Sequence, residues 1–476
     1  MTGIAASTSA GARSSDSLPG VVDREALRAA VGRRLGERSL VWAGIRGDDI
    51  EAIADLPHLE ASFTIIGAYR QRSSIEGLAY EDLAYHRPDL ETWDIDDHRE
   101  HEAAKEFRAQ LLGALAGPSA LLPYRSSPFL SAVHFARRDR CLNLGLFGAL
   151  QWAFEHKPWV ESSLMDLALP TIGWSYVADE EQLGTLSALR EGPLVLRRSR
   201  TSGGEGFELI ADADELVARW PKTDEGFVAV APYLGGAVPV NIGGTVWDDG
   251  VTVHLPSIQL TGIPSLTSRS FGHCGNDFGA ALDLDPSIVD QLDARTHTVG
   301  QWLSHHGYRG TFGVDYLVRD GEALFTEVNP RFQGSTSTSA RLSVRAGHAC
   351  LYLEHLAAML GEPAPPPVTL RETMGWIEPL SSVVVHWRGT ESARLDVRAL
   401  IAELHSAVPG CHVDVAAPER VVVDPGATVC RITVQGSVTT DGSTLDPRLD
   451  RVITAWQAQS GAAIGGAQEL ADMCFP

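Results

Sequence analysis

The chain has 476 residues and a formal net charge of -22, with a sequence pI near 5.1. This acidity argues against a nucleic-acid partner, which would need a basic stripe, and against an anionic membrane surface; no segment is long and apolar enough to span a bilayer. An apolar content of 44% supports large cores, so the composition favours a globular, cytoplasmic enzyme of about three domains over a disordered chain.

The first 150 residues are expected to hold a tail and an α/β domain. Residues 1–20 are rich in Ser, Ala and Gly without a long apolar core, which predicts a disordered tail rather than a signal peptide. Segments 39–44 and 62–67 are strand-like and end in glycine, and 98–116 has helical composition. We place this domain at residues 21–150. The six cysteines show no close pairing, as is typical of a reducing compartment.

Residues 193–210 contain an apolar strand, a basic turn, a glycine-rich loop and a second strand. Gly203, Gly204 and Gly206 let backbone amides approach an anion without hindrance from a Cβ, and Ser202 adds a hydroxyl donor. No Gly-Lys-Ser/Thr follows, and a strand rather than a helix comes next, so this is neither a Walker loop nor a dinucleotide fingerprint. Such loops are more often only tight turns; phosphate binding is the alternative.

Residues 313–331 are the most informative segment, because they combine oxygen ligands, a turn and a cation. Residues two apart in a strand share a face, so Glu327 and Asn329 can place a carboxylate and an amide oxygen on one metal ion. With Asp315 they form a set of hard donors, which suits Mg²⁺ or Mn²⁺ shared with substrate phosphates better than zinc. The alternative is a surface hairpin with charged outer positions.

The metal hypothesis depends on the loop of this hairpin. Asp320-Gly321 is a strong turn sequence between two strand-like runs. A three-residue loop, 319–321, would bring Asp315 to the face of Glu327. A two-residue loop that pairs Arg319 with Glu322 would send it to the other face. We therefore expect the three-residue loop.

The order of these segments resembles the ATP-grasp superfamily of ligases: a strand that ends in a cation, a glycine-rich flap, a long spacer, and an Asp before Glu-x-Asn-Pro-Arg. The resemblance covers about residues 150–361 and implies an ATP-grasp core at 151–361. It also implies ATP and Mg²⁺ (or Mn²⁺) as cofactors.

The resemblance assigns roles to individual residues. The flap residues that would cover the nucleotide phosphates are Ser202, Gly203, Gly204 and Gly206. The metal ligands would be Asp315, Glu327 and Asn329, and Arg331 would contact the transferred phosphoryl group. Segment 228–234 resembles the linker that holds adenine, with Ala231, Tyr233 and Leu234 as the contacting residues.

Two features depart from the family pattern. The family usually has Lys at the end of the first flap strand, where this chain has Arg197, and the linker lacks the usual acidic residues. Arg can replace Lys as a phosphate clamp, although lysine is scarce throughout, with three among 39 basic residues. One of these, Lys157, could be another nucleotide-contacting lysine; a solvated side chain is the interpretation we favour.

Two further loops carry chemistry-bearing residues. In 267–277, His273 adjoins Cys274, which suggests a nucleophilic thiol; we favour a mobile loop that contacts the acyl substrate or nucleotide, with Arg269 and His273 available for the contact. With Arg197 and Arg331, Arg269 completes our predicted catalytic set. The Ser/Thr run at 334–339 could donate hydroxyls to substrate, or cap a helix at 340–347; the two roles are compatible.

The Pro-rich segment 362–367 is predicted to be a linker between domains, followed by a small α+β domain at 368–476. Strands are expected at 381–387, 413–415, 420–423 and 429–434, and helices at 395–407 and 446–459. The expected fold is thus an ATP-grasp core between an N-terminal α/β pre-ATP-grasp domain and a C-terminal α+β domain.

An extra domain on each side of the core, together with Arg in place of Lys, is similar to the pheganomycin-type peptide ligases of bacterial antibiotic biosynthesis. This resemblance implies that a carboxylate is activated as an acyl phosphate and joined to an amine or peptide, with release of ADP and phosphate. The partners would be small molecules, and homodimerisation stays open. Three alternatives remain: a phosphotransferase, a ligase that acylates a carrier-protein thiol, and an inactive nucleotide-binding module.

Overall fold

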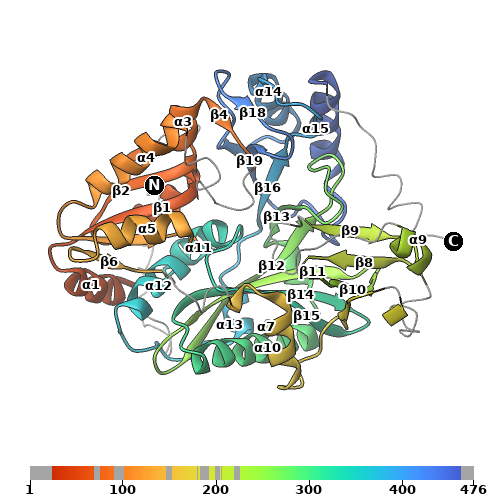
Figure 1. Ribbon diagram of the computed structural model, residues 1–476, viewed down its shortest axis with the longest axis horizontal. Coiled ribbons are helices and arrows are strands. Elements are labelled where there is room, and N and C mark those ends of the chain that lie inside the picture. Colours follow the sequence, from red (N-terminus) through yellow and green to blue (C-terminus); the bar gives the residue numbers. More distant parts are fainter. Residues whose placement is uncertain are drawn as a thin grey trace, which may run out of the picture.

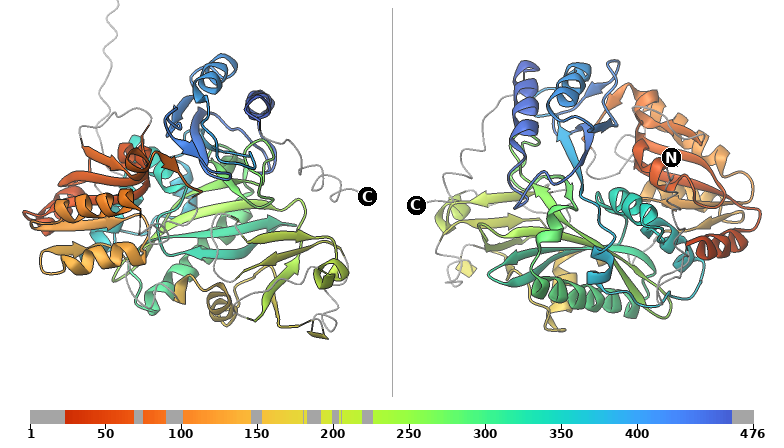
Figure 2. Two further views of the ribbon diagram at one scale, coloured as in Figure 1. Left: turned by 45° about the horizontal axis from the view of Figure 1, so that its top comes forward. Right: turned by 180° about the vertical axis from the view of Figure 1, so that it is seen from behind.

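A computed structural model describes residues 24–68, 75–89, 101–145, 153–179, 181–182, 192–198, 204, 206–218 and 226–461. Within these residues, three main sheets organise the molecule (Figure 1). The N-terminal sheet lies on one side, the large central sheet joins it to the C-terminal helices, and a small sheet lies at the opposite end (Figure 2).

The N-terminal sheet has five parallel strands in the order β3-β2-β1-β5-β6. These are β1 (Ser39–Arg46), β2 (Leu59–Ile66), β3 (Glu76–Ala79), β5 (Ser119–Pro123) and β6 (Cys141–Asn143). The flanking helices are α1 (Arg24–Leu35), α2 (Ile50–Ile53), α3 (Tyr80–Ala84), α4 (Glu102–Ala114) and α5 (Pro128–Ala136). Leu40 and Trp42 pack on one face and Val41 and Ala43 on the other, as expected of a sheet buried on both faces. The strands predicted near 39–44 and 62–67 and the helix predicted at 98–116 are confirmed.

The small sheet is antiparallel, in the order β7-β10-β8-β9. Its strands are β7 (Ser175–Val177), β8 (Leu194–Arg197), β9 (Phe207–Ile210) and β10 (Val228–Pro232). Helix α9 (Ala213–Ala218) adjoins β9, and α7 (Lys157–Met165) precedes β7 in the chain. The predicted strand–loop–strand around the glycine-rich segment is therefore present as the β8–β9 hairpin.

The large sheet has eight antiparallel strands in the order β15-β14-β11-β12-β13-β16-β19-β17. They are β11 (Val238–Val246), β12 (Val251–Thr261), β13 (His273–Asp277), β14 (Gly310–Arg319), β15 (Glu322–Asn329), β16 (Leu380–His386), β17 (His412–Asp414) and β19 (Thr428–Gln435). The long helix α10 (Pro286–His305) covers β11, β12, β14 and β15 from below in Figure 1. Helices α11 (Thr336–Arg345), α12 (Leu351–Met359) and α13 (Leu370–Met374) follow, along with the short helices η1 (Gly47–Asp49) and η4 (Ala280–Asp283) elsewhere in the chain.

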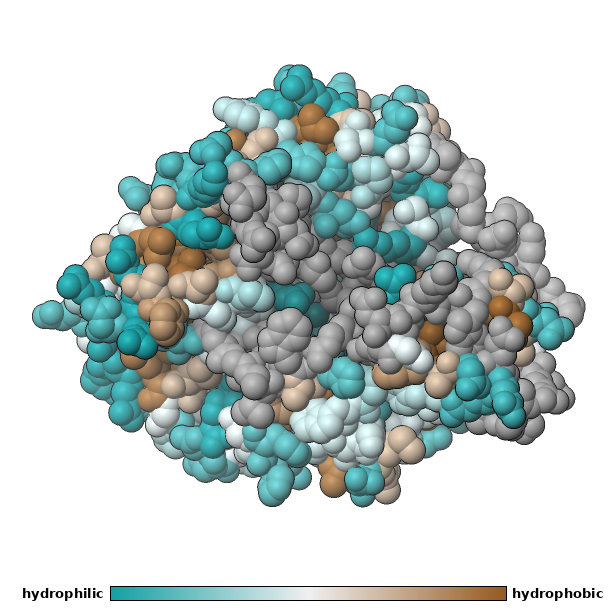
Figure 3. Space-filling model, viewed as in Figure 1, coloured by the Kyte–Doolittle hydropathy of each residue, from teal (hydrophilic) through white to brown (hydrophobic). Residues whose placement is uncertain are grey.

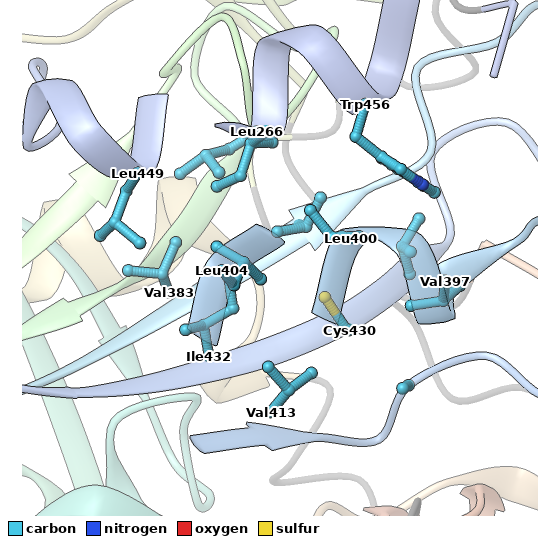
Figure 4. Packing of buried hydrophobic residues seen from close by; sticks show 14 of the residues in the cluster. Leu266, Val383, Val397, Leu400, Leu404, Val413, Cys430, Ile432, Leu449 and Trp456 are labelled. Atoms are coloured by element: carbon cyan, nitrogen blue, oxygen red, sulfur yellow. The ribbon is translucent and has the colours of Figure 1, made fainter. Parts of the chain in front are cut away.

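The C-terminal segment adds two helices to its end of the large sheet. Helices α14 (Val397–Ala407) and α15 (Pro447–Gln459) bury Leu400, Leu404 and Trp456 against β16 and β19 (Figure 4). The elements predicted past residue 380 are confirmed to within a few residues. Strand β16, which follows the Pro-rich segment, pairs with β13, so one sheet continues across 362–367. The division into domains at that segment stays a prediction.

The N-terminal segment is attached to the C-terminal one by a buried arginine. Strand β4 (His86–Arg87) pairs in parallel with β18 (Val422–Val423). The Arg87 guanidinium contacts both carboxylate oxygens of Glu81, at 2.6 and 2.9 Å, and donates to three backbone carbonyls, those of Val415, Thr428 and Val429. Arg87 is wholly buried, so this contact joins the two segments inside the molecule.

The face shown in Figure 3 is mostly hydrophilic, with apolar residues gathered on the side of the N-terminal sheet. Across the described ranges, no helix combines the length and apolar character needed to cross a bilayer. The five cysteines in the described part of the chain are all buried, and none of them forms a disulfide there.

Candidate functional site

The β14–β15 hairpin has a shorter loop than the sequence analysis predicted. Arg319 pairs with Glu322, so the loop contains only Asp320 and Gly321. Both have left-handed backbone conformations, with φ of 51° and 79°, as a two-residue type I′ turn requires. The predicted three-residue loop is therefore wrong, because Asp320 adopts a positive φ as readily as Gly321 does here.

A β-bulge nevertheless brings Asp315 to the predicted face. Tyr316 pairs with Phe325, but Asp315 pairs with Glu327, so Thr326 is an extra residue in β15. The Thr326 hydroxyl donates to the Asp315 carbonyl at 2.9 Å and fixes the bulge. The extra residue shifts the register by one position, so Asp315 lies directly opposite Glu327, with Asn329 on the same face.

Amide side chains orient the Asp315 carboxylate. Its Oδ1 accepts hydrogen bonds from Asn241 at 2.6 Å and Gln259 at 3.1 Å, and its Oδ2 accepts one from Asn329 at 3.1 Å. Burial and the neighbouring Glu327 carboxylate raise the pKa of Asp315 to about 6. The carboxylate is thus held in a fixed orientation where a cation would stabilise its charged form.

Asn241 is itself part of a wider polar network. Its Nδ2 also donates to Gln333 Oε1 at 2.8 Å, and its Oδ1 accepts from the Ser335 hydroxyl at 2.6 Å. The sequence analysis missed Asn241, Gln259 and Gln333. An amide within the apolar run of β11 was the available signal, because a buried polar side chain needs partners.

The donor set fits a divalent cation. Asp315, Glu327 and Asn329 present two carboxylates and an amide on one face, which matches the oxygen preference of Mg²⁺ or Mn²⁺. No group of three or more His, Cys, Asp or Glu side chains suited to a metal occurs among the residues described here, so any site of this kind relies on the amide. In this arrangement Lys157 Nζ lies 2.9 Å from Glu327 Oε2, and Arg331 Nη2 donates to Asn329 Oδ1 at 2.9 Å.

Lys157 is not a solvated side chain. It is 7% exposed and forms the ion pair with Glu327 from the first turn of α7. The interpretation that we favoured from the sequence is therefore wrong. Burial of this lysine beside a carboxylate indicates a specific role.

Helix α7 also connects the site to Arg197. Glu161, one turn after Lys157, accepts a hydrogen bond from Arg197 Nη2 at 2.5 Å and another from the Tyr176 hydroxyl. The Arg197 guanidinium lies 4.0 Å from the centroid of the Trp174 ring and is 1% exposed. Burial raises the pKa of Glu161 despite the arginine. One helix therefore carries contacts to both the end of β8 and the hairpin carboxylates.

The described parts of the predicted flap and linker lie around the small sheet. Gly204 and Gly206 have φ of 81° and 68°, and a Cβ on Gly204 would overlap the Phe271 carbonyl oxygen. Ser202 and Gly203 lie outside the described residues. Ala231 is in β10, opposite Val195 of β8. The Tyr233 amide donates to the Pro193 carbonyl at 2.8 Å, and Leu234 follows at the turn into β11.

The segment 267–277 contacts the N-terminal segment and the C-terminal core. Arg269 forms an ion pair with Asp89 of the N-terminal segment. Cys274 is fully buried in the C-terminal core, with its Sγ 3.2 Å from the Gly272 carbonyl oxygen. His273 contacts Asn276 at 3.0 Å, and burial lowers its pKa to about 4. Because the thiol lies in the core, the Cys–His interpretation is wrong.

The Ser/Thr run enters a helix earlier than expected. Helix α11 begins at Thr336, and the predicted side-chain cap is absent at Ser335, whose hydroxyl instead bonds Asn241. The Thr336 hydroxyl accepts from the Gln333 amide at 2.8 Å. This run therefore fixes the loop between Arg331 and α11.

No protein-family model matches the chain. Among sequence relatives, the formate-dependent phosphoribosylglycinamide formyltransferase of Prochlorococcus marinus is 26% identical over 42% of this chain and 48% of its own length. Its counterpart in Synechococcus elongatus is 25% identical over 70% of this chain and 75% of the relative. The chain thus spans about half the length of the first relatives it matches.

Solved structures match most of the chain. N5-carboxyaminoimidazole synthetase from Staphylococcus aureus, complexed with ADP, has a TM-score of 0.54 and 11% identity, over 83% of this chain and 93% of that one. Biotin carboxylase from Campylobacter jejuni has a TM-score of 0.53 and 13% identity, over 84% and 88%. At these identities the likeness shows a shared fold.

Proposed function

We propose that this chain, which has the ATP-grasp fold, is an ATP-dependent ligase that activates a carboxylate as an acyl phosphate and joins it to an amine. ADP and phosphate would be released. The observation that carries the proposal is the pairing of Asp315 with Glu327, beside Asn329, Lys157 and Arg331. In a nucleotide-binding module that had lost catalysis, we would not expect a buried amide network to orient these groups.

The proposed cofactors are ATP and Mg²⁺ or Mn²⁺. Asp315, Glu327 and Asn329 would hold the metal ions, which would neutralise charge on the nucleotide phosphates. Several ADP or ATP complexes among the structural neighbours support the nucleotide. The glycine-rich β8–β9 hairpin would cover the phosphates, and the β10–β11 connection would hold the adenine.

The chain's own cations stabilise charge in the proposed reaction. As the carboxylate oxygen attacks the γ-phosphorus of ATP, negative charge gathers on the transferred group. Lys157 already lies against Glu327 and Arg331 against Asn329, so both cations are held in place before reaction. Arg197, in turn, is fixed by Glu161 and stacked on Trp174. We retain Arg197, Arg269 and Arg331 as the proposed catalytic set and add Lys157.

Peptide-bond formation is the finer part of the proposal. The relatives found by sequence are named as formate-dependent formyltransferases, so they give no support for a peptide acceptor or for antibiotic biosynthesis. The support for a peptide ligase is the expected extra domain on each side of the ATP-grasp core, together with Arg197 in place of the usual lysine. A phosphotransferase and a ligase acylating a carrier thiol remain the alternatives.

A coupled assay separates these functions. The protein is incubated with ATP, Mg²⁺ and a panel of amino acids and N-acetylated amino acids, with and without added amine, and ADP and AMP are quantified. We expect ADP release that depends on both a carboxylate and an amine. Release of AMP and pyrophosphate would refute the acyl-phosphate route, and a phosphorylated product formed without amine would identify a phosphotransferase.

A further inference from the structure

One face of the large sheet carries a row of polar side chains that begins at the proposed metal site. Directly paired residues of neighbouring strands share a face, and so do residues two apart in one strand. The members of this polar row, from β15 to β13, are Glu327, Asp315, Asn241, Ser257, Gln259 and Asn276. Gln259 donates to Asp315 at 3.1 Å, and Asn276 donates to Ser257 at 3.0 Å. The polar row therefore leads from the metal site across the sheet to β13.

His273, the first residue of β13, lies at the end of the polar row. Its Nε2 is 3.0 Å from Asn276 Oδ1. Because Asn276 Nδ2 donates to Ser257, the Asn276 oxygen is the acceptor in this contact, and His273 Nε2 carries the proton. The other ring nitrogen, Nδ1, is then an acceptor with a lone pair.

Nδ1 of His273 is uncharged and accessible. In the described structure no hydrogen bond reaches it, and it is not among the buried polar atoms without a partner, so solvent reaches it. Burial, with added contributions from the charges of Arg46, Arg431 and Arg331, lowers the pKa of His273 to about 4. The ring is thus neutral near pH 7, and Nδ1 keeps its lone pair.

The loop after β15 connects this ring to the proposed reaction site. Arg331 begins the loop, and Gly334 packs on the ring, since a Cβ there would lie 2.8 Å from His273 Cε1. Because Gly334 has no side chain, that edge of the ring stays uncovered. Figure 3 shows the face hollowed near its middle, where Figure 1 places α11 and β12, with hydrophilic residues in the hollow.

The strand spacing gives the distance between the metal site and His273. Three strand intervals of about 4.8 Å separate β14 from β13, so these strands are roughly 14 Å apart. A metal ion, a phosphoryl group, an acyl carbon and an amine nitrogen in line fill such a span, because reacting neighbours lie about 3 Å apart. His273 therefore lies where the last of these groups, the amine, would be.

The chemistry of Nδ1 indicates the same group. At their reacting ends, the ATP phosphates, the carboxylate and the acyl phosphate are acceptors, and only the amine offers an N–H donor. We propose that His273 Nδ1 accepts a hydrogen bond from the amine substrate and so directs the nitrogen towards the acyl phosphate. His273 is then a catalytic residue of the second step. This inference rests on the proposed function and assigns its amine subsite.

The step at this subsite balances for a primary amine. The amine binds uncharged, after leaving its extra proton in solvent, and its lone pair attacks the acyl carbon. The C–N bond forms, and the bond from the acyl carbon to the phosphate oxygen breaks, with its electron pair going to phosphate. One N–H remains in the amide and the other proton passes to the phosphate, while His273 accepts a hydrogen bond and stays neutral.

The test separates formation of the acyl phosphate from its use. Positional isotope exchange in ATP with a heavy-oxygen label in the β,γ-bridge reports reversible acyl-phosphate formation, because the β-phosphate of bound ADP rotates before ATP re-forms. It is measured with N-acetylated amino acids, which cannot act as the amine. Amide formation is then measured with glycine, glycinamide or diglycine added.

The variants use the two nitrogen positions of the ring. Gln places its amide near the position of Nε2, where it can still contact Asn276, whereas Asn places its amide oxygen near the position of Nδ1. The variants are therefore His273→Gln and His273→Asn, with His305→Gln, at an exposed histidine of α10, as the control. The ratio of amide formation to isotope exchange is compared, because it does not depend on the folded fraction of each preparation.

We expect this ratio to fall about tenfold in His273→Gln, the effect of one lost hydrogen bond, less in His273→Asn, and not at all in the control. An unchanged ratio in His273→Gln would overturn the inference, as would an equal fall in both variants. Isotope exchange in the wild-type enzyme without amide from any of the three amines would overturn it too. Absence of isotope exchange with every carboxylate would instead refute the proposed function.

Discussion

Replacement of Arg87 by methionine tests how strongly the N-terminal and C-terminal segments are joined. The substitution removes two contacts to Glu81, at 2.6 and 2.9 Å, and three to the carbonyls of Val415, Thr428 and Val429. Glu81 is 1% exposed, and after the substitution the Gly67 backbone amide still donates to it at 2.6 Å. Breaking a buried pair in this way costs about 3–5 kcal/mol, because one charge stays buried without its counter-ion.

Urea unfolding, followed by circular dichroism and tryptophan fluorescence together, measures the loss. Arg87→Met should lower the free energy of unfolding by about 3–5 kcal/mol. Adding Glu81→Gln should recover part of that loss, since the double variant buries no unpaired charge. Arg371→Met, at the exposed pair with Asp290, is the control and should leave the urea midpoint unchanged. A loss below about 1 kcal/mol for Arg87→Met would show that this contact behaves as a surface pair, and the reasoning would fail.

Three further predictions concern the site and the core. Glu327→Gln, Asn329→Ala and Arg331→Ala should each lower turnover about 10²- to 10³-fold while the protein stays folded, and wild-type turnover in any of them would contradict the assignment. Gly204→Ala should raise KM for ATP because its Cβ would overlap the Phe271 carbonyl; Gly307→Ala has the same positive φ in open space and should leave KM unchanged. His355 is buried and neutral, with Nδ1 accepting from the Thr311 amide, and its pKa is lowered to about 4. The unfolded chain therefore binds protons first, so stability should fall as the pH drops from 6.5 towards 4. His355→Gln should flatten that fall in a series of thermal melts, and an identical pH profile in both proteins would count against the prediction.

Local patterns predicted most of the strands and helices, because alternation and turn residues act over a few positions. The β14–β15 hairpin is a case in which local patterns were not sufficient. Asp320-Gly321 correctly indicated a turn, but the shared face of Asp315 and Glu327 depends on an extra residue at Thr326. A bulge is stabilised by a hydrogen bond across the strands, and the sequence of one strand does not reveal it.

Contacts between distant segments were the other part that the sequence could not supply. Lys157 and Glu327 are far apart in the chain, and only the packing of α7 beside β15 brings them within 2.9 Å. The same holds for Asp48 and Arg431, which are 2.8 Å apart although they come from opposite ends of the chain. Arg197 was correctly placed at the end of a strand, but its partner Glu161 was not foreseen.

The continuous pairing of β13 with β16 has a practical consequence for anyone who shortens this chain. A fragment that stops at the Pro-rich segment would leave the N–H and C=O groups along one side of β13 without a neighbour. Exposed edges of this kind recruit strands from other molecules, and the apolar residues normally covered by α14 and α15 would lie beside that edge. Such a fragment should form intermolecular β-structure and precipitate. The segment after residue 367 is therefore better altered by point substitution than by deletion.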